Sequence, residues 1–249
     1  MQRLIIVSNR LPVVLKETDG NWTMEPGSGG LVTALSPVLK QDGGDWIGWP
    51  GISADAPFQS IFNEAEEQLG YQITPVTLSQ EEIDNYYYGF SNETLWPLFH
   101  SLLGRAAFDR SNWESYCKVN RKFAEVAAGV TGADDFIWFQ DYQLILAGEY
   151  FKELRPDTSS GFFLHIPFPS PDIFYRLPWR GPIIRALLNY DLIGFQTRKD
   201  LKNFIHCVRS LIPDARIKYR APYSVITWEG RSTLAGAFPI GIDYNKYND

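Results

Sequence analysis

Residues 136–165 read FIWFQDYQLILAGEYFKELRPDTSSGFFLH, and this stretch decides the fold class. Residues 136–139 and 161–165 are apolar runs of strand length, whereas residues 142–154 between them have apolar side chains at helical spacing. A strand, a helix and a second strand in this order are typical of a parallel sheet whose connecting helix covers one face. The stretch therefore predicts an α/β protein.

The same alternation continues along almost the whole chain. Further strands are predicted at residues 4–7, 45–49, 72–76, 192–195 and 237–240, and further helices at residues 31–40, 80–87, 93–103, 113–128, 182–189 and 198–211. Residues 13–24 differ, because two strand-like pieces flank Asp19-Gly20, which predicts an inserted β-hairpin. No repeat, charge block or long linker divides the chain. We therefore expect one domain, a parallel sheet with helices on both faces.

Composition narrows the function classes. The chain has 249 residues, 45% of them hydrophobic, and a formal net charge of -6, which is opposite to the charge of a general nucleic-acid or anionic-membrane binder. Cys117 and Cys207 lie far apart in no metal-binding spacing, so a disulfide framework is not supported. The apolar run at residues 4–7 is too short for a signal peptide or a membrane span. We expect a cytoplasmic protein.

Two candidate phosphate sites follow predicted strands or precede a helix. Ligands of an open parallel sheet bind at the carboxyl ends of its strands, and Arg10 directly follows the first strand. An arginine there can hold a phosphate through two parallel hydrogen bonds, or it can be a surface arginine paired with a carboxylate. Gly27-Ser28-Gly29-Gly30 precedes a predicted helix, where backbone N–H groups can hold a diphosphate. A simple turn after the hairpin is the alternative.

Two further candidates end apolar strands. Asp141 is either the N-cap of the next helix or a carboxylate directed at sugar hydroxyls. His165 is either a neutral imidazole that donates to a ligand or a hydrogen-bonded core group. The aromatic content of 15% serves cores by default, although ring faces also bind sugars. No metal-ligand cluster, G-x-S-x-G elbow or activated cysteine is present in the sequence, so we expect no bound metal and no covalent nucleophile.

Longer motifs indicate a family. They are RLIIVSNRLP at 3–12, GGL at 29–31, WIGWPG at 46–51, YYYGFSN at 86–92 with LWP at 95–97 and FH at 99–100, GFFLHIPFP at 161–169, DLIGFQT at 191–197 and FPIGID at 238–243. In this order they make the chain resemble, from end to end, the N-terminal half of the trehalose-6-phosphate synthases, a family of retaining glycosyltransferases.

The resemblance implies a GT-B architecture with two Rossmann-like domains. Residues 1–240 would be the acceptor-binding domain, and residues 241–249 would begin the linker to a C-terminal domain that binds the nucleotide sugar. By resemblance the acceptor sugar phosphate is bound by Arg10, Tyr87, Trp96, Asp141 and, as a pocket wall, Trp49; the donor is bound by Gly29, Gly30 and His165; and the catalytic residues are His165 and Asp141.

The reaction implied is transfer of glucose from UDP-glucose to glucose 6-phosphate, with retention and without a protein nucleophile, a metal or another cofactor. The partners implied are these two substrates and the C-terminal domain, not nucleic acid or membrane; association into a homo-oligomer is left open. The family often has His-Asp-Tyr-His where this chain has Gln140-Asp141-Tyr142-Gln143. Glutamine cannot titrate near neutral pH. Another phosphorylated acceptor, such as glycerol 3-phosphate, and a non-catalytic regulatory domain that binds sugar phosphates are therefore alternatives. A nicotinamide-dependent oxidoreductase would need a glycine fingerprint that the sequence lacks.

Overall fold

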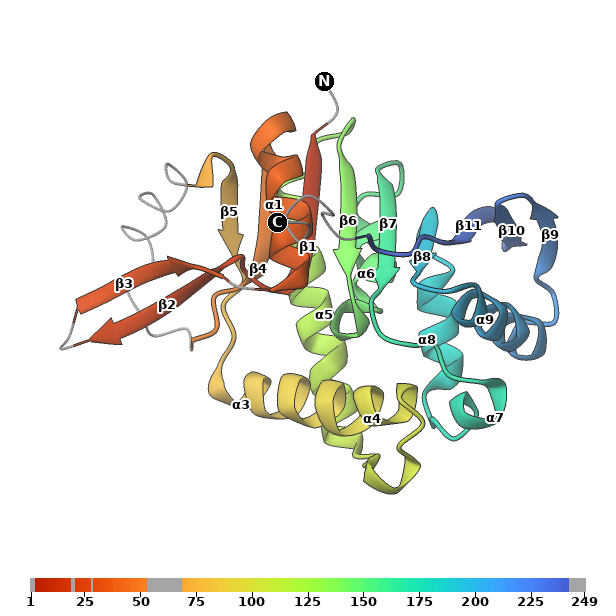
Figure 1. Cartoon of the computed structure of the whole chain (residues 1–249). Coiled ribbons are helices and arrows are strands. Elements are labelled where there is room, and N and C mark those ends of the chain that lie inside the picture. Colours follow the sequence, from red (N-terminus) through yellow and green to blue (C-terminus); the bar gives the residue numbers. More distant parts are fainter. Residues whose placement is uncertain (1–2, 19–20, 28, 53–68, 242–249) are drawn as a thin grey trace, which may run out of the picture.

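The sheet of this protein is mostly parallel, as the sequence predicts. The computed structural model describes residues 3–18, 21–27, 29–52 and 69–241. Within them, nine strands form one sheet in the order β5-β4-β1-β6-β7-β8-β11-β10-β9. Their bounds are β1 (Leu4–Arg10), β4 (Gly44–Trp49), β5 (Gln72–Pro75), β6 (Phe136–Gln140), β7 (Ser159–Leu164), β8 (Leu192–Phe195), β9 (Arg216–Arg220), β10 (Tyr223–Trp228) and β11 (Arg231–Ala237). All neighbours from β5 to β11 pair in parallel, and in Figure 1 the arrows of β5, β6 and β7 point to the same end.

Helices cover both faces of the sheet, as expected. The alternation of side chains along β1 separates two cores, because Ile5 and Val7 belong to one buried cluster and Ile6 to the other. The larger core lies under α5 (Arg110–Val130), α6 (Ala147–Leu154), α8 (Arg180–Leu187) and α9 (Arg198–Leu211), and the smaller core lies under α1 (Gly30–Asp42). The remaining short helices are α3 (Gln80–Glu82), α4 (Trp96–Phe99), α7 (Pro171–Phe174) and the single turns η2 (Leu103–Arg105) and η3 (Tyr142–Leu144).

The predicted hairpin is confirmed. β2 (Val13–Thr18) and β3 (Asn21–Pro26) pair antiparallel and form their own two-stranded sheet. Its predicted turn, Asp19-Gly20, lies outside the described residues. In Figure 1 the hairpin projects beyond the main sheet, next to the end of β1. It therefore adds a wall at the carboxyl end of β1.

The two helices predicted at residues 80–87 and 93–103 are one continuous helical run. It begins at Ser79, whose side chain and that of Glu82 form a capping box, and continues through the wide turns of η1 (Ile83–Leu95) into α4. The break expected near Gly89 is absent because this glycine gives room to α5: a Cβ there would overlap the Asn112 side chain. The predicted end at residue 103 is wrong, since α4 ends at Phe99.

The predicted strand at residues 237–240 is also wrong. β11 ends at Ala237, and only the N–H of Phe238 continues the pairing, with the carbonyl of Phe195 at 2.8 Å. Pro239 has no N–H to add to the ladder, so the chain leaves the sheet there. The antiparallel strands β9 and β10 were not predicted, because β9 is largely exposed and polar, which hides the strand pattern. Residues 242–249 lie outside the described residues, so the linker stays a prediction.

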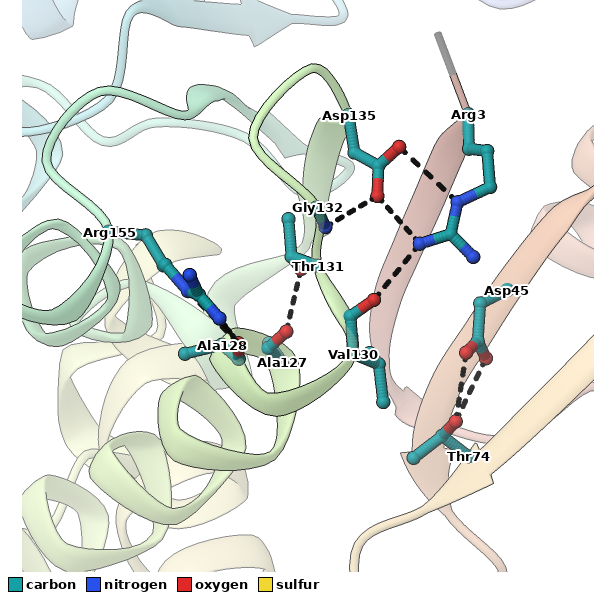
Figure 2. Close-up of polar contacts among 10 residues, drawn as sticks. All are labelled: Arg3, Asp45, Thr74, Ala127, Ala128, Val130, Thr131, Gly132, Asp135 and Arg155. Carbon is teal, nitrogen blue, oxygen red and sulfur yellow. Dashed lines mark hydrogen bonds and ion pairs between the residues drawn. The ribbon is translucent and has the colours of Figure 1, made fainter. Parts of the chain in front are cut away.

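The amino end of the sheet is fastened by paired charges, shown in Figure 2. Arg3 Nη2 donates to Asp135 Oδ2 at 2.7 Å and to the carbonyl of Val130 at 3.0 Å, which ties β1 to the loop before β6. On the next strand pair, Thr74 Oγ1 donates to both carboxylate oxygens of the buried Asp45. Charged groups at this end therefore serve the fold. Among the described residues, no helix is long and apolar enough to cross a membrane.

Candidate functional site

A cavity of about 550 Å³ opens at the carboxyl ends of β1 and β6. The hairpin, the start of α1 and η1 (Ile83–Leu95) close its other sides. Its lining residues are Ser8, Asn9, Arg10, Leu11, Val13, Val14, Gly27, Gly29, Leu31, Val32, Trp46, Pro50, Tyr87, Gln140, Asp141 and Gln143. The cavity thus contains three of the predicted acceptor and catalytic positions, Arg10, Tyr87 and Asp141, and lies where an open parallel sheet binds ligands.

Arg10 is the last residue of β1, and its guanidinium is held by ring faces. Its Cζ lies 4.0 Å from the centroid of the Trp49 ring and 5.7 Å from that of Tyr87. It makes no ion pair with a carboxylate among the described residues. The surface-ion-pair alternative therefore finds no support in the described part of the chain, and the guanidinium keeps its donors for a ligand.

The turn that carries Arg10 is rigid. Trp46 Nε1 donates to Ser8 Oγ at 2.8 Å, and Ser8 Oγ donates to the carbonyl of Arg10 at 2.6 Å. Tyr86 in turn donates its hydroxyl to Asn9 Oδ1 at 2.8 Å. These side chains satisfy the polar groups between the strand and the cavity, so the direction in which Arg10 leaves β1 is set before any ligand arrives.

Trp49 supports the site from beneath. It is buried, its Nε1 donates to the carbonyl of Ile52 at 2.8 Å, and its ring meets that of Tyr87 edge-on at 5.8 Å. It does not line the cavity. Gly51, with φ +93, lies at the Nη1 edge of the guanidinium, and a Cβ there would overlap Arg10 Nη1. The guanidinium therefore lies over a tryptophan ring, with its Nη1 edge against a glycine.

Asp141 follows β6 in a strained conformation, with φ +68. Its Oδ1 accepts hydrogen bonds from the backbone N–H of Tyr142 at 2.9 Å and of His165 at 3.1 Å. Burial nevertheless raises the pKa of the carboxyl to about 6, against the lowering effect of these backbone hydrogen bonds. The N-cap interpretation is confirmed, because Asp141 caps η3 (Tyr142–Leu144). Asp141 also lines the cavity, and its contact with sugar hydroxyls stays a prediction.

The glycine segment brings backbone to the cavity. Gly29 is the N-cap of α1, no side chain caps that helix, and its first turn has no acidic residue. A Cβ at Gly29 or Gly30 would meet nothing within 4 Å, so the space beside both is open. Gly27 donates its N–H to the carbonyl of Pro12 at 2.7 Å and also lines the cavity. Ser28 lies outside the described residues.

His165 follows β7 and lines a second cavity of about 370 Å³, next to the first. Its Nε2 lies 3.0 Å from Gln140 Oε1, and its Nδ1 lies 3.5 Å from Gln196 Nε2. Burial lowers the pKa of the imidazole to about 4, so the ring is neutral at physiological pH. Gln140 lines both cavities and stands between the two.

Trp96 is the last of the predicted site residues. It begins α4, 39% of it is exposed, and its ring is tilted against that of His100 with centroids 4.2 Å apart. It is not among the residues that line either cavity. Three further residues of the site were not predicted from the sequence: Gln140 as a contact of His165, Gln196 and Gly51. The rule of strand ends could have found Gln196, which directly follows β8, but nothing in the sequence marks the contact of Gly51 with Arg10.

Metal-ligating side chains do not cluster in the described part of the chain: no group of three or more His, Cys, Asp or Glu there could hold an ion.

The comparison that decides the family covers nearly the whole chain, because the model of the glycosyltransferase family 20 matches residues 2–249. The chain belongs to glycosyltransferase family 20. Family-20 relatives include the trehalose-6-phosphate synthases of Mycolicibacterium vanbaalenii and Mycolicibacterium gilvum, each 42% identical over 244 residues. The matches cover 96% of this chain and 50% and 48% of those proteins. This family-20 chain thus spans about half the length of the curated relatives it matches.

Solved structures have the same fold. An α,α-trehalose-phosphate synthase (UDP-forming) from Burkholderia xenovorans in complex with glucose-6-phosphate is 32% identical, with a TM-score of 0.79 over 96% of this chain and 50% of that one. A structure from E. coli bound with UDP-2-fluoro glucose is 33% identical, with a TM-score of 0.81 over 98% of this chain and 50% of that one. The predicted α/β fold and the resemblance to the trehalose-6-phosphate synthases are confirmed.

Proposed function

We propose that this chain is the acceptor-binding half of a retaining glucosyltransferase that makes trehalose 6-phosphate from UDP-glucose and glucose 6-phosphate. One observation carries the proposal: the Arg10 guanidinium, without a carboxylate partner among the described residues, shares a cavity with the Asp141 carboxylate. A guanidinium can bind a phosphate, and a carboxylate beside it can accept hydrogen bonds from sugar hydroxyls, so the pair suits a phosphorylated sugar. The B. xenovorans relative in complex with glucose-6-phosphate supports this choice of ligand.

The proposed roles follow from the contacts of each side chain. Arg10 binds the phosphate through two parallel N–H donors, and the Tyr87 hydroxyl adds a third. Asp141 accepts from sugar hydroxyls with the oxygen lone pairs that its backbone contacts leave free. Trp49 stabilises Arg10 from below. For Trp96, which lines neither cavity, the role in acceptor binding rests on the resemblance to the trehalose-6-phosphate synthases alone.

For the donor, we propose the junction between the two cavities. The diphosphate of UDP-glucose meets the free N–H groups at Gly29 and Gly30, and the glucose lies near His165. Residues 1–240 form the acceptor domain, residues 241–249 begin the linker, and a C-terminal domain binds the nucleotide. The double length of the curated relatives supports this division.

In the proposed step, the bond between glucose C1 and the diphosphate oxygen of UDP breaks, and a bond from C1 to the acceptor 1-hydroxyl oxygen forms on the same face of the sugar. The proton of that hydroxyl passes to the leaving diphosphate. The chain contributes positioning and charge stabilisation, with no protein nucleophile, metal or further cofactor.

Isothermal titration with glucose 6-phosphate tests the proposal on this chain. We expect saturable binding to the unchanged chain and about 100-fold weaker binding to Arg10→Ala, because a charge-assisted bidentate contact is lost. Arg220→Ala, at the end of the distant and exposed strand β9, is the matched control and should bind as the unchanged chain does. Equal heats for Arg10→Ala and the unchanged chain would contradict the proposal.

A product assay with the C-terminal half supplied tests the acceptor. UDP-glucose is offered with glucose 6-phosphate, glycerol 3-phosphate and other phosphorylated polyols in parallel. Trehalose 6-phosphate as the main product is the expected result. A preference for glycerol 3-phosphate would move the proposal to the alternative acceptor suggested by Gln140 and Gln143, and binding without any transfer would indicate a regulatory domain.

A further inference from the structure

The imidazole of His165 is held between two side-chain amides. Gln140 ends β6, His165 follows β7 and Gln196 follows β8, so three adjacent parallel strands each place one of these residues at the carboxyl edge. His165 Nε2 lies 3.0 Å from Gln140 Oε1, and His165 Nδ1 lies 3.5 Å from Gln196 Nε2. Each ring nitrogen therefore faces one amide.

The hydrogen bonds have a definite direction. The backbone N–H of Ile240 donates to Gln196 Oε1 at 3.0 Å, which fixes that amide and turns its Nε2 toward the ring. An amide N–H is only a donor, so Nδ1 of His165 must accept. A neutral imidazole that accepts at Nδ1 has its proton on Nε2, and this N–H donates to Gln140 Oε1.

We propose that Gln140 and Gln196 are positioning residues that hold His165 as a neutral imidazole protonated on Nε2, beside the place where donor and acceptor meet. The amides suit this role because they bind both ring nitrogens without a charge. A carboxylate in place of Gln140 would also accept from Nε2, but it would stabilise the imidazolium. The consequence for glucosyl transfer rests on the proposed function, whereas the state of the ring does not.

The surroundings of the ring agree with a neutral state. Phe163 lies with its ring centroid 4.7 Å from that of His165, and α1 contributes the apolar Leu31 and Leu35 to the cavity that His165 lines. The nearby Asp141 carboxylate binds the backbone N–H of His165 rather than the ring. Burial is what lowers the pKa of the imidazole to about 4.

Among the described residues, the side-chain amide of Gln140 makes a hydrogen bond through its oxygen and not through its nitrogen. The residue is 1% exposed, and its Nε2 has no hydrogen-bond partner in the described part of the chain. A buried donor without a partner is unfavourable, so an apolar residue would be the more stable choice if the amide had no task. The contact of its Oε1 with His165 is the hydrogen bond that this side chain makes there.

Nitrogen-15 NMR of the chain tests the proposal directly, since only three histidines give imidazole signals and His165→Asn assigns the relevant one. We expect the pattern of a neutral ring protonated on Nε2, with a titration midpoint near the low pKa of about 4. Gln140→Glu should raise that midpoint by about one to three pH units. Gln140→Met and Gln196→Met should each give a mixture of the two neutral tautomers.

Gln143→Glu is the matched control, because it adds the same charge on the same segment but lines only the acceptor cavity, away from the ring. It should shift the His165 midpoint by much less than Gln140→Glu does. A proton on Nδ1 in the unchanged chain would overturn the proposal, as would equal midpoints for the two glutamate variants. The methionine variants keep the test open if a glutamate variant does not fold, because an unchanged tautomer in both would also overturn it.

Turnover with the C-terminal half supplied separates this inference from the proposed function. Between about pH 4 and its raised midpoint, Gln140→Glu carries a charged His165, so its transfer rate should fall more steeply with falling pH than that of the unchanged chain, in which Asp141 gains a proton over this range but His165 does not. If NMR shows His165 protonated on Nε2 but no glucose is transferred, only the proposed function is contradicted. If glucose is transferred but His165 is protonated on Nδ1, only the positioning role of the two glutamines is contradicted.

Discussion

Two aspartates flank the same strand, and their surroundings shift their pKa values in opposite directions. Asp135 directly precedes β6, and Asp141 directly follows it. The hydrogen bond and charge of Arg3 lower the pKa of Asp135, whereas burial raises the pKa of Asp141 to about 6 and outweighs its backbone hydrogen bonds and the weaker effect of His100. At the amino end of the sheet the carboxylate stabilises the fold, and at the carboxyl end a carboxylate is kept at a cost in stability.

The same contrast holds for the arginines of β1. Arg3, just before the strand, forms an ion pair with Asp135, while Arg10, its last residue, forms none among the described residues. Charged side chains at the amino edge of the sheet are therefore paired within the fold, whereas those at the carboxyl edge are available to a ligand.

Asp141→Asn should have the largest effect on stability. The unfolded aspartate loses its proton near pH 4 and the folded one near pH 6, so the free energy of unfolding falls as pH rises through this window. Asparagine removes that cost, tolerates positive φ and keeps the acceptor for the backbone N–H groups. Urea unfolding should give the variant a free energy of unfolding about 2 kcal/mol higher than that of the unchanged chain at pH 7.5, and almost the same value at pH 4.

The same variant should bind glucose 6-phosphate more weakly, since an amide oxygen is a poorer acceptor than a carboxylate. Asp134→Asn, an exposed neighbour of Asp135, is the control and should change neither quantity. A loss of stability in Asp141→Asn at pH 7.5 would break the contrast between the two edges.

Asp135→Asn should lower the free energy of unfolding, the opposite of the effect of Asp141→Asn. A lowered folded pKa contributes stability that is present above the unfolded pKa near 4 and is lost as pH falls through the folded value. We expect a loss of about 1 kcal/mol at pH 7, because Arg3 is partly exposed to solvent, and a shrinking difference below pH 4. Urea unfolding measures it, and calorimetric binding of glucose 6-phosphate should stay unchanged. Weaker binding would show that the amino edge also serves the site.

Gly51→Ala should weaken binding of glucose 6-phosphate about tenfold, because the added Cβ pushes the guanidinium of Arg10 off its place over Trp49. Gly70→Ala is the matched control: Gly70 has a similar positive φ, +75, but open space beside it. Both variants should lose similar stability, and only Gly51→Ala should lose affinity in titration calorimetry. Equal affinities would mean that the position of Arg10 is not preset by its neighbours.

Tyr87→Phe should have the smallest effect. The hydroxyl of Tyr87 makes no hydrogen bond among the described residues, so its removal should leave the thermal midpoint unchanged. If the hydroxyl donates to the phosphate, affinity falls about threefold to tenfold. Tyr88→Phe, the exposed neighbour, gives the baseline. Affinity equal to that baseline would remove Tyr87 from the phosphate contacts.

Local patterns predicted much of this fold. The helix predicted at residues 198–211 has those bounds in the structure, and the six strand predictions other than the one at residues 237–240 are confirmed to within a few residues. The wrong or missing predictions lie where long-range packing determines whether a helix continues or a strand forms. Gly89, expected near a break, instead makes room for α5, and the polar strand β9 forms because β10 pairs with it. Neither partner can be read from the local sequence.

The candidate site was predictable to the extent that it obeys one topological rule. Arg10, Asp141 and His165 each follow a strand, and parallel strands bring their carboxyl ends to one edge. The support of Arg10 by Trp49 and Gly51, and the contacts of Gln140 and Gln196 with His165, join residues 25 to 41 positions apart. The sequence shows that such residues exist but not that they touch.

The order of strands and helices, the hairpin and the residues that end each strand follow from the amino-acid sequence, because they depend on periodicity and on turn chemistry over short stretches. Which charges are paired follows only from the folded arrangement of the chain. Asp135 and Asp141 are the same residue type six positions apart, and their pKa values move in opposite directions because one meets Arg3 across the sheet and the other is buried among backbone donors. The pKa of a side chain depends on its neighbours in space, and those neighbours come from distant parts of the chain.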